Sequence, residues 1–504
     1  MLSVTDPAPF PKPPAMFNMA AYVLQHADRL GPKTALRIVG ENAQDFTYRQ
    51  IKSAVLGTAT GLLQQGLCAG DFLLMQLGNS PTFPITYLGA IAVGIIPVPV
   101  SAQLTAPEIA RISAMIGPTL TIRAADTPPA PGRTLDAEAL KQFWHLPPAE
   151  YVMGDPNRLA YIVFTSGTSG QPRAVVHAHR AIWARQMMWD GWYGLRETDR
   201  MMHAGAFNWT YTLGTGLMDP WSVGATALIP SEGTEIDTLG DLLAAEKATL
   251  FAAAPGVYRR LLRQPLPDLP HLRHGLSAGE KLASVLATEW TERTGKPVHE
   301  AFGMSECSTF ISSAPARPAP KGAAGYPQDG RKVALIGDDG PVPRGIPGTI
   351  AVHRDDPGLM LGYYNDPNET AARFQGEWFL TGDIGIMADD GAITYAGRAD
   401  DLMNAGGYRV SPIEVEDALT AHPAITEAAA CAVQLRADTM LIAAFYVASD
   451  VIDEDTLDAF MRAHLAGYQC PRIYMAKEAL PRGANNKLLR RVLRQEWENA
   501  HGQA

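Results

Sequence analysis

The sequence is poor in cysteine and contains no long apolar run. Its 504 residues include four cysteines, Cys68, Cys307, Cys431 and Cys470, with no CxxC pair and no spacing typical of metal ligands. Disulfides are therefore not expected, and a reducing, cytoplasmic setting fits the composition. No apolar stretch is long enough to span a bilayer, and the proline-rich N-terminus does not resemble a signal peptide. We expect no membrane partner.

The chain also has no excess of basic residues. Lysine and arginine number 42 against 52 aspartates and glutamates, which gives a formal net charge of -10. This balance argues against nucleic acid or an anionic membrane as the main partner. A small anionic ligand stays possible, because a local basic cluster can lie within an acidic surface.

What is present is typical of a globular α/β protein. Apolar residues make up 46% of the chain and charged residues 19%, and its length exceeds what one hydrophobic core usually supports. A helical pattern over residues 46–66 precedes short apolar runs such as DFLLMQLG and IAVGIIPVPV. Alternation of this kind predicts α/β sheets flanked by helices.

The pattern changes twice along the chain. From about residue 326, short strands lie between Gly, Pro and Asp turns, which predicts a β-rich subdomain over about 326–397. The charged turn GRADD at 397–401 is the expected boundary. We therefore predict a large N-terminal domain over 1–397 and a mobile α+β C-terminal domain over 398–504.

One loop is rich in hydroxyls and glycine. The stretch Val163–His177 reads VFTSGTSGQPRAVVH, lacks the lysine of a Walker A loop, and continues into Pro172 and a β-branched run. It is therefore predicted to join two strands. Its backbone N–H groups and hydroxyls could wrap a polyphosphate, although an ordinary flexible loop would look the same. The candidate phosphate-binding residues are Thr165, Ser166, Gly167, Thr168, Ser169, Gly170 and Arg173.

TSGTSGQPR resembles the phosphate loop of the adenylate-forming superfamily, which comprises acyl-CoA synthetases, adenylation domains of peptide synthetases and luciferases. Further matches follow in the family's order and spacing. They are SAGEKL at 277–282, EAFGMSE at 300–306, FLTGDIG at 379–385, GRADDLMNAGGYRVSPIEVE at 397–416 and PRGANNKLLR at 481–490. Six matches cover nearly the whole chain, so the chain is identified as a member. The resemblance implies ATP, Mg²⁺ and coenzyme A as cofactors.

The resemblance also implies a nucleotide site. Phe302 is expected to stack on adenine, Ser305 to help bind phosphate, and Glu306 to hold Mg²⁺, for which a carboxylate is a suitable ligand. Asp383 is expected to accept hydrogen bonds from the ribose hydroxyls, although TGD also makes a good β-turn. The adenine pocket is expected to be completed by Gly279, Glu280, Ala301 and Gly303.

Residues near the predicted boundary acquire roles in the same way. Arg398 would reach ATP, Arg409 would lie near phosphate, and Asp400 matches the hinge of the small domain. The adjacent Gly406 and Gly407 resemble a loop that lines the pantetheine tunnel of coenzyme A, although two glycines in tandem could be a plain turn.

Lys487 is the principal catalytic candidate. Leu488, Leu489, Val492, Leu493 and Trp497 predict a helix with one apolar face, capped by Asn485 or Asn486. Lys487 would then lie in the first turn, where the helix dipole also favours an anion. In the family this lysine bridges the substrate carboxylate and the α-phosphate. The chain departs from the family at Arg173 and Ala174, where PKG has Lys and Gly, and at Asn486, where Gly is usual.

A last segment concerns the acyl pocket. HAGAFNWTYTLGTGL is closer to the aryl-CoA ligase branch, such as benzoate–CoA ligases, than to the usual PxFHxxG pattern. Aromatic walls stack on flat rings and narrow a pocket, but the same residues could belong to the core. The candidate pocket residues are Phe207, Asn208, Trp209 and Tyr211.

The predicted function is that of an ATP-dependent carboxylate–CoA ligase acting on a small-molecule aryl or short- to medium-chain acid. An adenylation enzyme that loads a separate carrier protein is the alternative. A non-catalytic nucleotide-binding protein is disfavoured by the presence of both Glu306 and Lys487. The expected assembly is a monomer or a homodimer.

Overall fold

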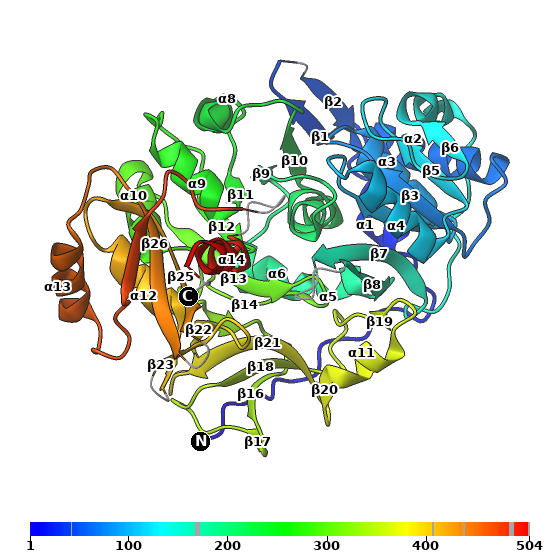
Figure 1. Ribbon diagram of the computed structural model, residues 1–504. Helices are drawn as coiled ribbons and strands as arrows, with labels where there is room; N and C mark the ends of the chain where they lie inside the picture. The colour runs from blue at the N-terminus through cyan, green and yellow to red at the C-terminus, as the bar shows by residue number, and fades with distance from the viewer. Residues whose placement is uncertain (42, 167–171, 406–407, 437–438, 483–487, 502–504) are drawn as a thin grey trace.

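The computed structural model describes residues 1–41, 43–166, 172–405, 408–436, 439–482 and 488–501. The side chains of residues 166, 404–405, 408–409, 435–436 and 439 are outside this description. Figure 1 shows several sheets with helices packed around them, and the C-terminal residues form a separate layer at one side. The predicted α/β class with a large N-terminal part is confirmed.

A nine-stranded sheet forms the centre of the molecule (Figure 1). Its six inner strands are parallel, and the strands at both edges pair antiparallel. The carboxyl ends of the parallel strands therefore meet at one edge, where open α/β sheets bind their ligands. In spatial order the strands are β15 (Tyr326–Pro327), β14 (Ser308–Ser312), β13 (Val298–Met304), β12 (His274–Ala278), β11 (Leu250–Ala253), β9 (Arg200–His203), β10 (Thr226–Pro230), β1 (Thr34–Val39) and β2 (Gln44–Thr47).

A second, parallel sheet lies beside it. Its order is β4 (Ile96–Val100), β3 (Phe72–Gln76), β5 (Leu120–Arg123) and β6 (Thr134–Asp136). The run IAVGIIPVPV is only partly a strand, because α3 (Thr82–Ala92) continues to Ala92 and the chain turns at Gly94 with φ +77° before β4. Strand β4 contains two prolines, which its edge position tolerates. Helix α2 (Tyr48–Gln64) begins at a capping box formed by Thr47 and Gln50.

The remaining helices cover these two sheets or connect their strands. They are α1 (Met19–Val23), α4 (Ala106–Ile116), η1 (Ala137–His145), α5 (Ala181–Ala184), α6 (Gln186–Met188), η2 (Trp189–Tyr193), η3 (Thr212–Met218), α7 (Asp219–Val223), η4 (Ile236–Thr238), α8 (Leu239–Ala245), α9 (Pro255–Leu262) and α10 (Ser284–Thr294). Among the helices in the described residues, none combines the length and apolar character needed to cross a bilayer.

Two antiparallel sheets complete the part of the chain before the C-terminal layer. A three-stranded sheet joins β7 (Leu159–Ser166), β8 (Pro172–Ala178) and the two-residue β19 (Gly362–Tyr363). The larger sheet has the order β17 (Gly340–Pro341), β16 (Val333–Gly337), β18 (Gly348–His353), β21 (Trp378–Met387) and β20 (Phe374–Gln375), with β22 (Ile393–Arg398) on β21. This sheet spans most of the predicted β-rich segment. Helix α11 (Pro367–Ala372) lies between β19 and β20.

The C-terminal layer is an α+β unit. Strands β23 (Met403–Ala405) and β24 (Tyr408–Val410) pair, and β25 (Ile425–Arg436), β26 (Thr439–Ala448) and β27 (Ile473–Ala476) form a separate sheet. Its helices are α12 (Pro412–Thr420), α13 (Glu454–His464) and α14 (Arg490–His501). The predicted domain boundary at 397/398 stays a prediction. The predicted C-terminal helix starts later than expected, because α14 begins at Arg490 and excludes Leu488 and Leu489; Lys487 lies outside the described residues.

Candidate active site

The hydroxyl-rich loop joins two antiparallel strands, as its sequence predicts. Thr165 pairs with Arg173 and Ser166 with Pro172, so β7 and β8 converge where the loop begins and ends. The predicted phosphate ligands Gly167, Thr168, Ser169 and Gly170 lie outside the described residues. With a strand on each side, the loop would bind phosphate without a helix dipole.

Arg173 already has a partner. Its Nη2 lies 2.8 Å from Oε1 of Glu369 in α11, and its guanidinium lies 5.5 Å from the ring centroid of Tyr363. The guanidinium that we expected to bind phosphate thus also pairs with a carboxylate. The predicted role of Arg173 stays a prediction, and it would need the guanidinium to divide its contacts between Glu369 and phosphate.

The EAFGMSE motif forms β13 and the turn that follows it. Phe302 packs against Phe310 and Tyr395, each with ring centroids 5.4 Å apart. A Cβ at Gly303 would lie 2.3 Å from the carbonyl oxygen of Ser308, so no side chain fits there. Ala301, one residue before Phe302, is buried, and the backbone of Ser308 packs directly against Gly303.

Glu306 is almost fully buried, with 7% of its surface exposed. The hydroxyl of Tyr363 donates to its Oε1 at 2.8 Å, and the backbone N–H of Met360 donates to its carbonyl oxygen at 2.8 Å. No hydrogen bond within the described residues engages Oε2. Oε1 of Glu306 is therefore hydrogen-bonded to Tyr363, and Oε2 is the oxygen that can bind an external ligand.

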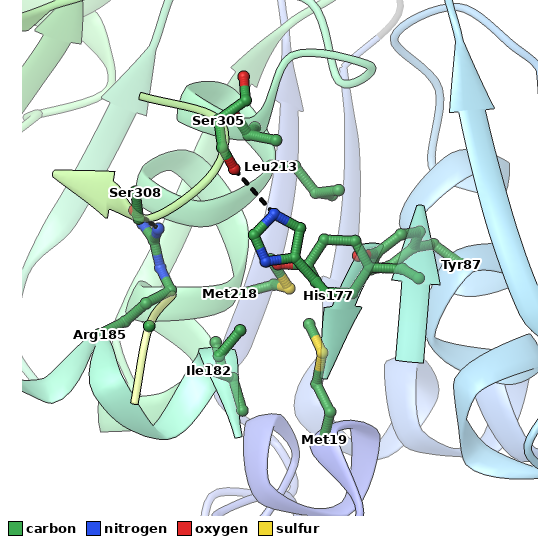
Figure 2. Close-up of a pocket in the computed structure, with 13 residues that line it drawn as sticks. Met19, Tyr87, His177, Ile182, Arg185, Leu213, Met218, Ser305 and Ser308 are labelled. Atoms are coloured by element: carbon green, nitrogen blue, oxygen red, sulfur yellow. Dashed lines mark hydrogen bonds between the residues drawn. The ribbon is translucent and has the colours of Figure 1, made fainter. Parts of the chain in front are cut away.

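Beneath this turn lies a small cavity of about 30 Å³. Figure 2 shows His177 near its centre, with Nε2 bonded to the carbonyl oxygen of Ser305 at 2.8 Å. Burial lowers the pKa of His177 to about 4, so the imidazole is neutral at pH 7 and donates through Nε2. Nδ1 is buried with no hydrogen-bond partner among the described residues. The cavity could hold a water molecule, but it is too small for an acyl substrate.

A buried ion pair borders the same cavity. Arg185 contacts Asp219 through Nε at 2.8 Å and Nη2 at 2.6 Å, and its Nη1 donates to Ser308 Oγ at 2.5 Å. Ser308 has φ +67°, a conformation that non-glycine residues adopt rarely. Arg185 thus fixes the strained residue that follows the Glu306 turn. The sequence offered no signal for this pair, whose partners are 34 positions apart.

The SAGEKL turn meets the aromatic candidates. Gly279 has φ +98°, and a Cβ there would lie 2.7 Å from Trp209 Cζ2. Tyr211 packs edge-on against Trp209 at 5.1 Å and His203 at 4.4 Å. These residues form one aromatic wall at the ends of the parallel strands. Phe207 instead packs against Phe83 at 5.5 Å in the core, while Asn208 is partly exposed.

Glu280 connects the N-terminal and C-terminal parts of the chain. Its Oε1 accepts a hydrogen bond from the backbone N–H of Leu488 at 3.0 Å, and Arg482 Nη1 lies 3.6 Å from its Oε2. Lys487 lies outside the described residues, but the residues just before and after the undescribed stretch 483–487 both meet this one carboxylate.

Further ion pairs fasten the same two parts. Lys281 Nζ lies 2.6 Å from Asp417 Oδ2. Glu427 accepts from Arg482 at 2.9 Å and also lies 3.6 Å from Arg263 and 4.0 Å from Arg259. Together these contacts dock the C-terminal layer on the edge of the central sheet.

Asp383 and Arg398 lie opposite each other on β21 and β22. The hydroxyl of Tyr395 donates to Asp383 Oδ1 at 3.0 Å, and Arg398 Nη1 lies 3.4 Å from Oδ2. Arg398 Nε also donates to Asp400 at 3.1 Å, which links the expected ribose ligand to the expected hinge. Arg409 contributes backbone to β24, its side chain is not described, and Gly406 and Gly407 lie outside the described residues.

Comparison with known proteins gives this arrangement a family. The protein-family model described as AMP-binding enzyme matches residues 23–364. A second family model, described as AMP-binding enzyme C-terminal domain, matches residues 414–487. The chain belongs to the AMP-binding enzyme family. The superfamily predicted from the six motifs is therefore confirmed, as is an enzyme of the acid–CoA ligase type.

Individual relatives are similar over nearly their full length. The benzoate–CoA ligase of Thauera aromatica is 30% identical, over 98% of this chain and 99% of the relative. The human mitochondrial acyl-coenzyme A synthetase ACSM2A is 29% identical, over 96% and 92%. The crystal structure of the anthranilate CoA ligase AuaEII with anthranoyl-AMP superimposes with a TM-score of 0.88 at 25% identity, covering 97% of this chain and 99% of that one.

Proposed function

We propose that the protein is an ATP-dependent carboxylate–CoA ligase that works in two half-reactions. The carboxylate of an aryl or short- to medium-chain acid attacks the α-phosphorus of ATP, which gives an acyl-adenylate and releases pyrophosphate. The thiol of coenzyme A then attacks the acyl carbon, which gives a thioester and releases AMP. The observation that carries this proposal is the attachment of both flanks of the Lys487 segment to Glu280.

Adenylation needs alignment more than proton transfer. Carboxylic acids are ionised at pH 7, so no general base is required to make the nucleophile. The Lys487 ammonium is proposed to hold the acid and the α-phosphate together and to stabilise the charge that develops between them. Arg398 adds a second cation, and its ion pair with Asp383 orients it toward the proposed ribose site.

Glu306 fits a Mg²⁺ ion that arrives with ATP. Magnesium prefers oxygen ligands and is often bound through one or two carboxylates together with substrate phosphates. No group of three metal-ligating side chains occurs among the residues that the structure describes, so the nucleotide would have to complete the site. When bound, the ion would neutralise phosphate charge as pyrophosphate leaves.

The second half-reaction requires the C-terminal layer to move. Lys487 must leave before the thiol can approach the adenylate, so the contacts of Glu280, Lys281 and Glu427 across the interface must break. Asp400 is half exposed and joined to Arg398, which suits a residue that absorbs such a rotation. Gly406 and Gly407 are proposed to line the pantetheine path after it.

An aryl acid is the favoured substrate class. Trp209 presents aromatic surface beside Gly279, with Tyr211 buried against it, and aromatic rings pack well against flat rings. The names of the relatives in Thauera aromatica and of the anthranilate ligase support the same class.

Acid-dependent exchange of labelled pyrophosphate into ATP tests the proposal. We expect exchange with benzoate, a hydroxybenzoate or anthranilate to exceed that with octanoate, and free coenzyme A to be consumed as AMP forms. Exchange without any thioester from free coenzyme A would favour loading of a carrier protein instead. An absence of exchange across aryl and aliphatic acids would refute a ligase function.

A further inference from the structure

The carboxylate of Glu306 is held from one side only. Its Oε1 accepts a hydrogen bond of 2.8 Å from Tyr363, whereas no described residue donates to Oε2. An ionised carboxylate is only an acceptor, so the phenol must be the donor. Tyr363 is 6% exposed and Glu306 is 7% exposed, so water competes little for this hydrogen bond.

Tyr363 is itself fixed by several independent contacts. It lies in β19, where it pairs with Val175 of β8, the strand that follows the phosphate loop. Its backbone N–H donates to Thr370 Oγ1 at 2.9 Å, and the guanidinium of Arg173 lies 5.5 Å from its ring centroid. The hydroxyl therefore cannot move far without disturbing the strand that leads out of the loop.

We propose that Tyr363 is a positioning residue that occupies Oε1 of Glu306, so that Oε2 is presented as a single fixed oxygen to the cation of Mg·ATP. This inference rests on the proposed function. A carboxylate that is free at both oxygens could rotate or bind the ion through both of them, and Mg²⁺ tolerates little departure from octahedral geometry. Partners that orient a metal-binding carboxylate commonly contribute ten- to a hundredfold to metal affinity.

The ring of Tyr363 also packs in the core beneath the β-rich sheet, which is the competing explanation. Phenylalanine keeps this packing and the contact with Arg173 while removing the donor. Tyr363→Phe therefore separates the two roles. Tyr364→Phe is a matched control, because Tyr364 is the next residue, its ring packs on Phe72 at 5.4 Å, and its hydroxyl makes no hydrogen bond among the described residues.

The test is a Mg²⁺ titration of pyrophosphate exchange at fixed ATP and acid. We expect Tyr363→Phe to raise the Mg²⁺ concentration at half-maximal rate by about tenfold or more, and Tyr364→Phe to leave it unchanged. A second readout is binding alone: calorimetry should show weaker Mg·ATP binding by Tyr363→Phe, with binding of ATP in excess EDTA unaffected.

A double-mutant cycle guards against a purely structural effect. In a Glu306→Gln background, Tyr363→Phe should change Mg²⁺ dependence less than twofold, because the oriented carboxylate is already absent. Equal Mg²⁺ dependence of Tyr363→Phe and the unmodified protein would overturn the inference while leaving the ligase function intact. Additive effects in the cycle would overturn it as well. Failure of the unmodified protein to catalyse any exchange would instead refute the proposed function.

Discussion

Removal of the charge of Glu427 should weaken the docking of the C-terminal layer. Glu427 lies on β25 and meets Arg482 at 2.9 Å in its own layer, and Arg263 and Arg259 of the N-terminal part at 3.6 and 4.0 Å. Glu427→Gln keeps the shape but leaves three guanidinium groups with less negative charge between them. Arg482 would then also hold Glu280 less firmly.

The size of the effect follows from distance and exposure. Hydrogen bonds to charged groups contribute about 1.5–3 kcal/mol when buried, whereas exposed ion pairs contribute about 0.2–1 kcal/mol. Only the contacts with Arg263 and Arg259 cross the interface, and they are long, with Arg263 59% exposed. We therefore expect docking to weaken by about 0.2–1 kcal/mol, which is a factor of up to about 5 in the docking equilibrium.

The assay measures the two half-reactions separately. Pyrophosphate exchange should fall by up to the same factor, because its rate follows the docked fraction. Thioester formation from supplied acyl-AMP should be unchanged or faster, since it needs the undocked arrangement. Glu496→Gln is the control, because Glu496 pairs with Lys477 at 2.9 Å within the C-terminal layer. Equal slowing of both half-reactions, or no change in exchange, would refute this reasoning.

Three further changes test other parts of the site. Lys487→Ala should slow pyrophosphate exchange about a hundredfold or more yet spare thioester formation from acyl-AMP; equal losses would contradict its role. Gly279→Ala should lower the free energy of unfolding by about 1–3 kcal/mol. Adding Trp209→Ala in the same chain should restore only part of that free energy, because it removes the 2.7 Å contact but not the φ of +98°. Full recovery of the free energy of unfolding would rule out backbone strain. Because burial lowers the pKa of His177 from 6.5 to about 4, the unfolded chain binds more protons between these values. The contribution of neutral His177 to the free energy of unfolding is fully present above pH 6.5, and about 3 kcal/mol of it is lost as pH falls to 4. Unfolding in urea should therefore become easier at pH 5 than at pH 7.5. His177→Asn should reduce that difference between the two pH values.

Sequence patterns predicted best what depends on neighbouring residues. The absence of a Walker lysine and the run after Pro172 correctly placed a strand on each side of the phosphate loop. Ser411 caps α12 by accepting a hydrogen bond from the backbone N–H of Ile413, as a serine directly before a helix commonly does. In such places local geometry and hydrogen bonding decide the conformation.

Predictions failed where the conformation or the contacts of a residue depend on a partner that is far away in the sequence. The helix that was expected to include Leu488 and Leu489 starts at Arg490, because Leu488 bridges Arg482 and the backbone N–H of Leu489 donates to Pro481. Tyr363 bonds Glu306 from 57 residues away, and His177 bonds Ser305 from 128 residues away. Spacing within one sequence does not encode such pairs, so the surroundings of the candidate metal ligand could not be predicted.

The attachment of Arg482 and Leu488 to Glu280 affects how the ammonium of Lys487 could be replaced by a dissolved amine. Arg482 and Leu488 both contact Glu280, so the described chain on either side of residues 483–487 is attached to one carboxylate of the N-terminal part. Groups that are linked to a site by a short attachment reach effective concentrations in the millimolar range. A dissolved alkylamine offered to a Lys487→Ala enzyme would thus have to be supplied at comparable or higher concentration before it could substitute for the missing ammonium.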